Sequence, residues 1–385
     1  MKVFIAGIDG YLGWPLALYL KGRGHIVAGA DSFLRRDLVD EIKGWSATPI
    51  AARTDRMQQD NIDFIYGEMR AIPHILNSLR SFNPDAIVHL AEMPSAPYSM
   101  IDAEHAVFTH TNNLTGTLNI LHAMRDVCPD AHLVKLGSMG EYGTPNVDIP
   151  EGDFVMDFRA RMDRMPFPKQ AGSWYHQTKV HDSNNIMMAC RLWGLKSTDI
   201  MQGVVFGTRT DEMGDDERLL TRFDFDQCFG TVINRFCAQA VIGEPLTLYG
   251  SGHQKRGFLP LRDSMQCLGL AIENPPGDGE YRVFNQFQEV YELLDLAWMV
   301  LNTADDMGIN SEIRHVDNPR IEAEDHYYNP DHQKLLDLGY QPTTDIEAEI
   351  AITLKDLIKY KGRIEAKKDV LMPDIRWDGK KCPTK

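Results

Sequence analysis

The sequence lacks any long hydrophobic run. No window reaches the roughly 18 consecutive apolar residues that a membrane span requires, and an apolar stretch typical of a strand begins already at Lys2. We therefore expect no membrane span, no signal or transit peptide, and a cytoplasmic protein. With 43% hydrophobic residues among 385, the chain can nevertheless bury a large core.

Cysteine and positive charge are also scarce. The six cysteines form no C-x-x-C pair and have no metal-like spacing, so we expect buried thiols and no metal site. They are Cys128, Cys190, Cys228, Cys237, Cys267 and Cys382. The formal net charge of -15 argues against nucleic acids and anionic membranes as partners, because both require a positive field. An anionic small substrate would have to meet arginines placed locally.

What the sequence does contain begins with a strand, a glycine turn and a helix. Residues 2–6 are apolar, Gly7, Gly10 and Gly13 follow, and a helical pattern occupies 16–20. In this spacing the first glycine allows a tight turn, the second lets a pyrophosphate approach the backbone, and the third permits close helix packing. The motif predicts a dinucleotide site at the end of the first strand.

The acidic residue that such a site needs follows the second strand. Residues 25–30 end at Asp31, about 20 residues beyond the glycines, where a carboxylate can bind both ribose hydroxyls. Asp31 would also repel a 2′-phosphate, so NAD is favoured. The nearby Arg35 and Arg36 leave NADP open as the alternative.

Other positions near these strand ends are expected to contact the cofactor. Glu68 follows a third strand at 64–66 and would lie near the adenine. Leu90, Ala91 and Glu92 end a fourth strand, near the pyrophosphate and nicotinamide. The remaining expected contacts are Asp9, Tyr11, Leu12, Gln202 and Val205.

Strands that alternate with helices predict a parallel sheet. Apolar runs at 132–136 and 197–201, with helical patterns at 106–124 and 174–193, continue the alternation. We expect an α/β fold, a Rossmann-type doubly wound parallel sheet with a smaller C-terminal substrate-binding domain. The predicted sheet domain covers 1–205 with returns near 258–272 and 283–302, the second domain covers 206–257 and 273–350, and 351–385 form the end of a terminal helix and a tail.

Several segments outside this alternation carry their own predictions. We expect loops at 95–100 and 208–226, a long excursion at 150–172, a glycine-rich turn at 250–258, and helices at 231–242, 290–307 and 346–364. Long helices such as 106–124 often pair across a dimer in related folds, so a homodimer or a larger homo-oligomer is expected.

Two segments carry the chemistry. Tyr175 and Lys179 are four residues apart in a predicted helix and therefore share one face. The lysine ammonium lowers the tyrosine pKa, and the phenolate can take a proton while hydride passes to NAD. Ser138 and Glu141 lie in the glycine-rich stretch after the fifth strand, where open α/β sheets bind ligands. For Glu141 the alternative is a carboxylate bound to the backbone of its own turn.

The glycine turn, Asp31, Ser138 and the pair of Tyr175 and Lys179 resemble the extended short-chain dehydrogenases that act on nucleotide sugars. Longer sequence segments resemble one family among them, the UDP-sulfoquinovose synthases. The segments are SAPYSMID at 95–102, LVKLGSMGEYGTPNVD at 133–148, KVHDS at 179–183, QGVV at 202–205, VFNQF at 283–287, and NPR, EAE and HYYN between 318 and 329. The resemblance spans nearly the whole chain.

The resemblance implies that UDP-glucose and sulfite are converted to UDP-sulfoquinovose, with a tightly held NAD reduced and reoxidised in each turnover. It implies that Tyr175, assisted by Lys179 and Ser138, takes the 4-hydroxyl proton as hydride leaves C4. Glu141 is the expected base at C5. His176 is the expected acid at C6, with a packing histidine as the alternative. Sulfite, free or from a donor protein, would then add to the 5-ene.

The resemblance also implies contacts to the sugar nucleotide. Arg256 and Arg320 are expected against the diphosphate, because arginine forks suit phosphate. Met139 and Gly140 stand where related 4,6-dehydratases usually carry adjacent Asp and Glu, and the small Gly140 is expected to leave space for sulfite beside C6. Plastid members carry arginine at the position of Pro94, which leaves the sulfite contacts open. The remaining expected contacts are Ser95, Gln202, Asn234 and Arg235.

Three alternative functions remain open on the sequence. A 4-epimerase shares the serine, tyrosine and lysine but needs no base at C5. A nucleotide-sugar 4,6-dehydratase needs an acid that is missing before Glu141. A non-catalytic NAD-sensing protein is the third alternative, and the intact pair of Tyr175 and Lys179 argues against it.

Overall fold

The computed structural model of the chain describes residues 1–59 and 62–379. Five of the six cysteines lie in these ranges, and all five are buried and free. Cys382 lies outside the described residues. In the part of the chain that the structure describes, no helix is both long enough and apolar enough to cross a membrane.

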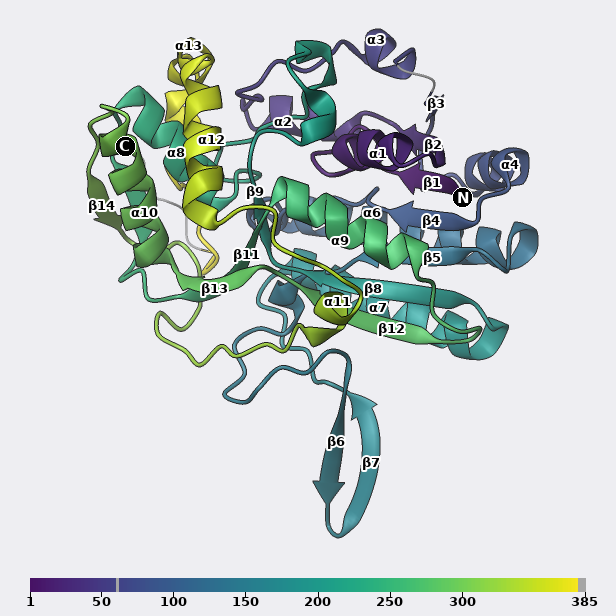
Figure 1. Cartoon of the computed structure of the whole chain (residues 1–385). Helices are drawn as coiled ribbons and strands as arrows, with labels where there is room; N and C mark the ends of the chain where they lie inside the picture. Colours follow the sequence, from purple (N-terminus) through teal and green to yellow (C-terminus); the bar gives the residue numbers. More distant parts are fainter. Residues whose placement is uncertain (60–61, 380–385) are drawn as a thin grey trace.

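A seven-stranded parallel sheet forms the centre of the molecule (Figure 1), in the order β12-β8-β5-β4-β1-β2-β3. Its strands are β1 (Lys2–Ala6), β2 (Ile26–Asp31), β3 (Asp63–Tyr66), β4 (Ala86–His89), β5 (His132–Leu136), β8 (Lys196–Gln202) and β12 (Tyr281–Gln286). All strands run in the same direction, but the chain adds β2 and β3 on one side of β1 and the later strands on the other, so the strand order reverses at β1. The carboxyl ends of strands at such a point form a crevice that binds ligands. The predicted fold class is confirmed.

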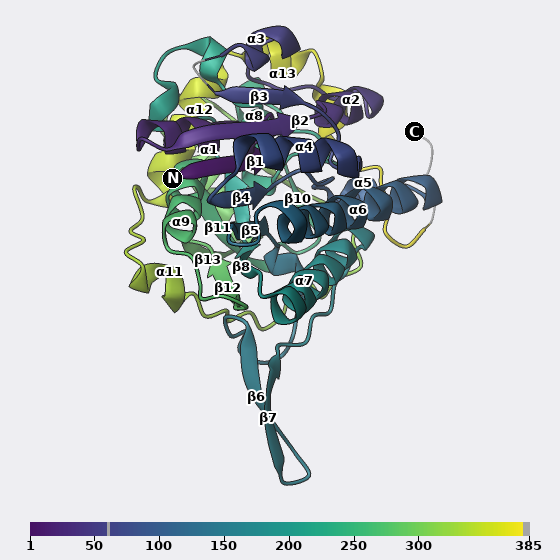
Figure 2. The same cartoon turned by 90° about the vertical axis from the view of Figure 1, so that its right-hand side faces the viewer.

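Helices cover both faces of this sheet (Figure 2). On one face lie α1 (Gly13–Gly22) and α9 (Leu261–Glu273); on the other lie α4 (Ile72–Phe82), α6 (Ala103–Val127) and α7 (Trp174–Trp193). Each face therefore has its own apolar core. Because the inner strands are buried on both faces, they read as nearly continuous apolar runs, which is why their positions could be predicted.

A further apolar core, separate from the two on the faces of the sheet, lies beside the carboxyl ends of the strands (Figure 1), and we name it the second core. Its helices are α8 (Val232–Ile242), α10 (Leu293–Asp306), α12 (Ile346–Ile358) and α13 (Lys361–Glu365). Its strands are β9 (Val204–Phe206), β11 (Lys255–Pro260), β13 (Glu289–Glu292), β10 (Leu246–Tyr249) and β14 (Ile313–Val316). The domain boundaries proposed from the sequence stay a prediction.

Some predicted segments differ from the structure. The predicted turn at 250–258 ends earlier than expected, because β11 begins at Lys255. The predicted helix at 290–307 begins later than expected, because β13 continues to Glu292 and α10 begins at Leu293. The predicted helix at 346–364 is two helices, α12 and α13. Within 208–226 the residues Phe223 and Phe225 are fully buried, so only the earlier, acidic part is an exposed loop. Shorter elements are α2 (Leu34–Glu41), α3 (Arg53–Met57), α5 (Ala96–Ser99) and α11 (Gln333–Asp337).

The predicted excursion at 150–172 contains a β-hairpin. Strands β6 (Asp153–Phe158) and β7 (Arg161–Pro166) pair with each other and project away from the body of the molecule (Figures 1 and 2). Every residue of the two strands is exposed except the half-buried Phe154.

Candidate active site

A cavity of about 410 Å³ lies where the sheet meets the second core. Its wall combines the glycine turn after β1, the segment after β5, the start of α7 and arginines from the second core. The predicted cofactor residues that line it are Gly7, Gly10, Tyr11, Leu12, Gly13, Asp31, Arg35, Glu68, Leu90, Ala91, Glu92, Tyr175, Lys179, Gln202 and Val205. The predicted catalytic and substrate residues that line it are Ser138, His176, Ser95, Asn234, Arg235, Arg256 and Arg320. Asp9, Arg36, Met139, Gly140 and Glu141 are not part of this lining.

The glycine turn is shaped by close backbone packing. Gly7 has a φ of +89°, and a Cβ on it would lie 2.6 Å from the carbonyl carbon of Leu90. A Cβ on Gly13 would lie 2.1 Å from the Gly7 carbonyl oxygen. On Gly10 the nearest approach would be 3.2 Å, to that same oxygen. Helix α1 begins at Gly13, so its N-terminus faces a pyrophosphate position. The turn therefore fits the dinucleotide that its spacing predicts.

Asp31 ends β2 at the cavity wall. Its carboxylate accepts hydrogen bonds from the backbone amides of Asp9, at 2.9 Å, and Phe33, at 2.7 Å. Burial raises its pKa to about 6, and the negative Asp9 adds to this. The two bonds fix the carboxylate at the rim of the turn, where the ribose hydroxyls of a dinucleotide would lie.

The two arginines that kept NADP open are both bound to carboxylates. Arg36 forms a two-pronged pair with Asp9, with both N–O distances 2.7 Å. Arg35 pairs with Asp224 at 2.6 Å and lies over the ring of Phe229. Arg36 thus binds Asp9 behind the turn rather than a cofactor. This geometry favours NAD.

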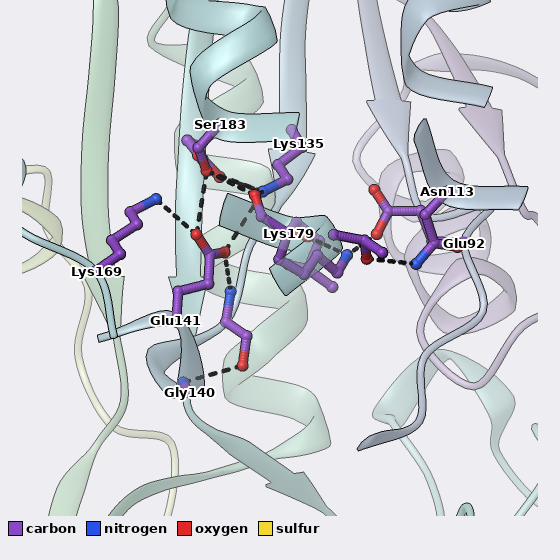
Figure 3. Close-up of polar contacts among 12 residues, drawn as sticks. Glu92, Asn113, Lys135, Gly140, Glu141, Lys169, Lys179 and Ser183 are labelled. Carbon is purple, nitrogen blue, oxygen red and sulfur yellow. Dashed lines mark hydrogen bonds and ion pairs between the residues drawn. The ribbon is translucent and has the colours of Figure 1, made fainter. Parts of the chain in front are cut away.

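Ser138, Tyr175 and Lys179 all line the cavity. Lys179 donates to the carbonyl oxygen of Leu136 at 2.6 Å and forms a close ion pair with Glu92 (Figure 3). Its ammonium lies 5.7 Å from the centre of the Tyr175 ring. Burial lowers the pKa of Lys179 to about 8. Burial raises the pKa of the Tyr175 phenol, and the negative Glu141 adds to this, whereas the sequence predicts a pKa lowered by Lys179.

His176 occupies the space that Gly140 leaves. A Cβ built on Gly140 would lie 2.3 Å from Nε2 of His176. This differs from the prediction that Gly140 opens room for sulfite, because the imidazole takes that room. His176 Nδ1 lies 2.9 Å from the Ser173 hydroxyl oxygen. Burial lowers the pKa of His176 to about 3, and the positive Arg320 and Arg256 act in the same direction, so the ring is neutral.

Glu141 points away from the cavity (Figure 3). One carboxylate oxygen accepts a hydrogen bond from the backbone amide of Ser138, at 3.0 Å, and lies 3.5 Å from Nζ of Lys135. The other accepts from Lys169, at 2.6 Å, and from Ser183, at 3.2 Å. With Ser138 it forms a capping box around the 3-10 turn η1 (Met139–Glu141). Both oxygens are therefore bound behind the turn, as in the alternative of a carboxylate bound to its own turn, and the role of Glu141 as the C5 base stays a prediction.

The nucleotide end of the cavity is built from the second core. Arg256 pairs with Glu322 and lies 3.2 Å from Nε2 of His326. Arg320 lies over the ring of Trp377. Arg256 and Arg320 both act to lower the pKa of the largely buried Glu322. Arg256 and Arg320 therefore bring two guanidinium groups to this end of the cavity, one of them paired with Glu322.

Several residues at the site were not predicted from the sequence. Lys135, Lys169 and Ser183 are the partners of Glu141, and Glu322 is the partner of Arg256. The capping-box pattern S-x-x-E at 138–141 was a usable signal for the bound state of Glu141. Lys169, Ser183 and Glu322 come from distant parts of the chain, so no local pattern could indicate them, whereas Lys135 is six residues from Glu141.

Residues 3–285 match the model of the NAD dependent epimerase/dehydratase family. The chain belongs to this family, whose fold and NAD site agree with the geometry above.

Within it, the chain belongs to the UDP-sulfoquinovose synthases. It is 46% identical over 384 residues to the UDP-sulfoquinovose synthase of Sulfolobus acidocaldarius, covering 98% of each protein. It is 45% identical over 382 residues to the chloroplastic UDP-sulfoquinovose synthase of Spinacia oleracea, covering 98% of this chain and 79% of that protein.

Solved structures share the fold at lower identity. The UDP-glucose 4-epimerase of Thermus thermophilus in complex with NAD has a TM-score of 0.67 and 21% identity, covering 93% of this chain and 99% of that one. The UDP-glucuronic acid 4-epimerase of Bacillus cereus, in complex with UDP-glucuronic acid and NAD, has a TM-score of 0.69 and 19% identity, with the same coverage.

Proposed function

We propose that this chain converts UDP-glucose and sulfite to UDP-sulfoquinovose, holding NAD tightly and restoring it within each turnover. The observation that carries the proposal is one cavity lined by Tyr175, Lys179, Ser138 and His176 together with Arg256 and Arg320, whose guanidinium groups suit a diphosphate. The full-length similarity to two UDP-sulfoquinovose synthases supports it. We also propose that the second substrate is sulfite, either free or delivered by a donor protein. The enzyme is proposed to be a homodimer and to act in the cytoplasm.

The first step is oxidation at C4 of the glucose. When bound, NAD accepts a hydride from the sugar and later returns it. Tyr175 takes the proton of the 4-hydroxyl, and Lys179 stabilises the phenolate form that does so. Ser138 donates to the oxygen at C4. The resulting 4-ketone acidifies the proton at C5, which prepares the sugar for loss of water.

The second step removes the C5 proton and the 6-hydroxyl. His176 lines the cavity wall with a neutral imidazole, because burial lowers its pKa, and a ring nitrogen of a neutral imidazole can accept a proton. We assign the C5 proton to Nε2 of His176, while Nδ1 donates to Ser173. The imidazolium then gives that proton to the departing 6-hydroxyl, so water leaves and the ring is neutral again. Hydrogen sulfite adds across the 5-ene, with sulfur on C6 and a proton returned to C5.

Product masses test the proposal. Purified protein is incubated with UDP-glucose, with and without sulfite, and the sugar nucleotide is analysed by mass spectrometry. We expect a mass gain equal to SO₂ only when sulfite is present. An unchanged mass under both conditions would favour a 4-epimerase, and loss of water without sulfite uptake would favour a 4,6-dehydratase.

His176→Ala tests the second step by itself. Loss of a general acid–base group costs about 10² to 10⁴ in rate, so sulfonated product should fall by about that factor. Hydride transfer at C4 should persist, seen as the near-ultraviolet absorbance of reduced cofactor. His181→Ala, one turn further along α7, is the matched control and should retain normal product formation. Normal turnover of the His176 variant would contradict the assignment.

A further inference from the structure

The β6–β7 hairpin lacks the support that a two-stranded sheet needs. It extends from the body as an arm (Figures 1 and 2), and β6 pairs with β7 alone among residues 1–59 and 62–379. An isolated hairpin is marginally stable in water. Its outer edges also present unpaired backbone groups, which are templates for pairing with another strand. The arm therefore has a free edge and exposed apolar side chains.

The side chains of β6 are arranged symmetrically about Met156. Alternate residues of a strand point to one face, so Phe154, Met156 and Phe158 share a face. Met156 is 37% exposed and Phe158 is 64% exposed. Beyond this apolar row stand two opposite charges, Asp153 at one end, which lies 3.5 Å from Arg164 of β7, and Arg159 in the hairpin turn at the other.

We propose that β6 pairs antiparallel with β6 of a second copy of this chain, about a two-fold axis at Met156. In this register Met156 faces Met156 of the second copy. Phe154 faces Phe158 on either side, and Asp153 faces Arg159. The four arm strands then form one antiparallel sheet, and the same surface patch serves both copies, as a two-fold interface requires.

Charge favours a second copy as the occupant. Residues 153–166 contain three aspartates and three arginines, so the arm is neutral, whereas the whole chain carries -15. Two acidic bodies repel each other, and neutral arms let the copies meet away from the bodies. A two-fold axis centred on Asp163 or Arg164, in the middle of β7, would place like charges opposite each other. The pattern therefore selects the edge of β6.

Charge reversal at the axis tests the register. The mass of the full-length chain is measured by light scattering over a concentration series. Met156→Asp and Met156→Lys each place like charges on the axis, so each should weaken this association at least tenfold. An equimolar mixture of the two should restore it, because Asp then faces Lys. Met162→Asp, on β7, introduces the same charge away from the axis and should leave the mass unchanged.

A symmetric disulfide gives a second, independent test. Opposite residues in an antiparallel pair have Cα atoms about 4.5–5.5 Å apart, which a disulfide can bridge. In a Cys382→Ser background, Met156→Cys should cross-link two chains under oxidation. Val155→Cys should not, because residue 155 faces residue 157 in this register.

Circular dichroism and NAD binding establish that each variant is folded. Three results would overturn the proposal: a monomeric wild type, an unchanged mass for Met156→Asp, or equal cross-linking of both cysteine variants.

Discussion

Glu141 shows how a carboxylate can serve an active site without reaching the substrate. It is fully buried, and its neighbours Lys135 and Lys169 hold its charge behind the turn. The backbone amide of Ser138 donates to it. The carboxylate therefore fixes the turn that presents the Ser138 hydroxyl to the cavity. We therefore propose that Glu141 is a positioning residue whose effect on catalysis passes through Ser138.

Glu141→Gln separates a positioning role from a base. Removing one partner of a buried ion pair costs about 3–5 kcal/mol, so we expect the free energy of unfolding in urea to fall by about 3 kcal/mol. The turnover number of the folded enzyme should fall by less than about tenfold, because loss of a direct base costs about 10² or more.

Glu244→Gln is the control for this change. Its carboxylate is 41% exposed and pairs with Lys368, and an exposed pair contributes at most about 1 kcal/mol. A Glu141 variant that is as stable as wild type but loses a hundredfold in turnover would support the base assignment.

At this scale, the spacing along a helix could be predicted, and the S-x-x-E pattern was a signal that Glu141 binds its own turn. The lysines that hold its carboxylate could not be predicted. Tyr175 and Lys179 share a face because the helix geometry fixes residues four apart. Glu141 lies in a 3-10 turn, and its direction is set by Lys135 in β5 and Lys169 near β7. Those partners become neighbours only in the folded chain.

At the scale of elements, the turn η1 and the N-terminus of α7 fit together through one missing side chain. Gly140 lies against His176, and Ser173, the N-cap of α7, holds the other side of the imidazole. The two elements together fix where the ring points. The glycine is therefore required by the histidine.

Gly140→Ala is expected to displace His176. The new Cβ would lie 2.3 Å from Nε2 of His176. This distance is a steric overlap, so the imidazole must rotate away. Sulfonated product should fall at least tenfold, while reduction of the cofactor by UDP-glucose continues. Both are followed in one assay, by mass spectrometry and absorbance. Gly172→Ala is the control, since a Cβ there meets nothing within 4 Å. Equal product from both variants would show that the contact has no role.

The strands of the central sheet could be predicted because strands that are buried on both faces consist mostly of apolar residues. Strands β1 and β5 were found at their observed bounds for this reason. Strands β6 and β7 project away from the cores, so the alternate apolar residues of β6 do not face a core and did not mark the segment as a strand. Strand β13 contains two glutamates, and the apolar run of α10 directly after it concealed the boundary.

At the scale of the whole molecule, the site exists because two cores meet. The sheet contributes the glycine turn and the catalytic side chains, and the second core contributes Arg256, with Arg320 in the segment after β14. These parts are far apart in the sequence, so their meeting could be expected only from the fold class. We propose that this arrangement separates two tasks, with the cofactor on the sheet side and the diphosphate on the side of the second core.

This separation predicts that one arginine can be lost without harming the cofactor site. Arg256→Gln removes a fork that now binds Glu322 and that we assign to the diphosphate. A hydrogen bond to a charged group contributes about 1.5–3 kcal/mol, so the affinity for UDP should fall about tenfold or more, while the affinity for NAD stays the same. Calorimetric titration with each ligand measures both. Arg314→Gln, an exposed arginine paired with Glu312, should change neither. If the Arg256 variant loses both affinities equally, the two cores do not divide the ligands in this way, and the diphosphate must lie closer to the glycine turn.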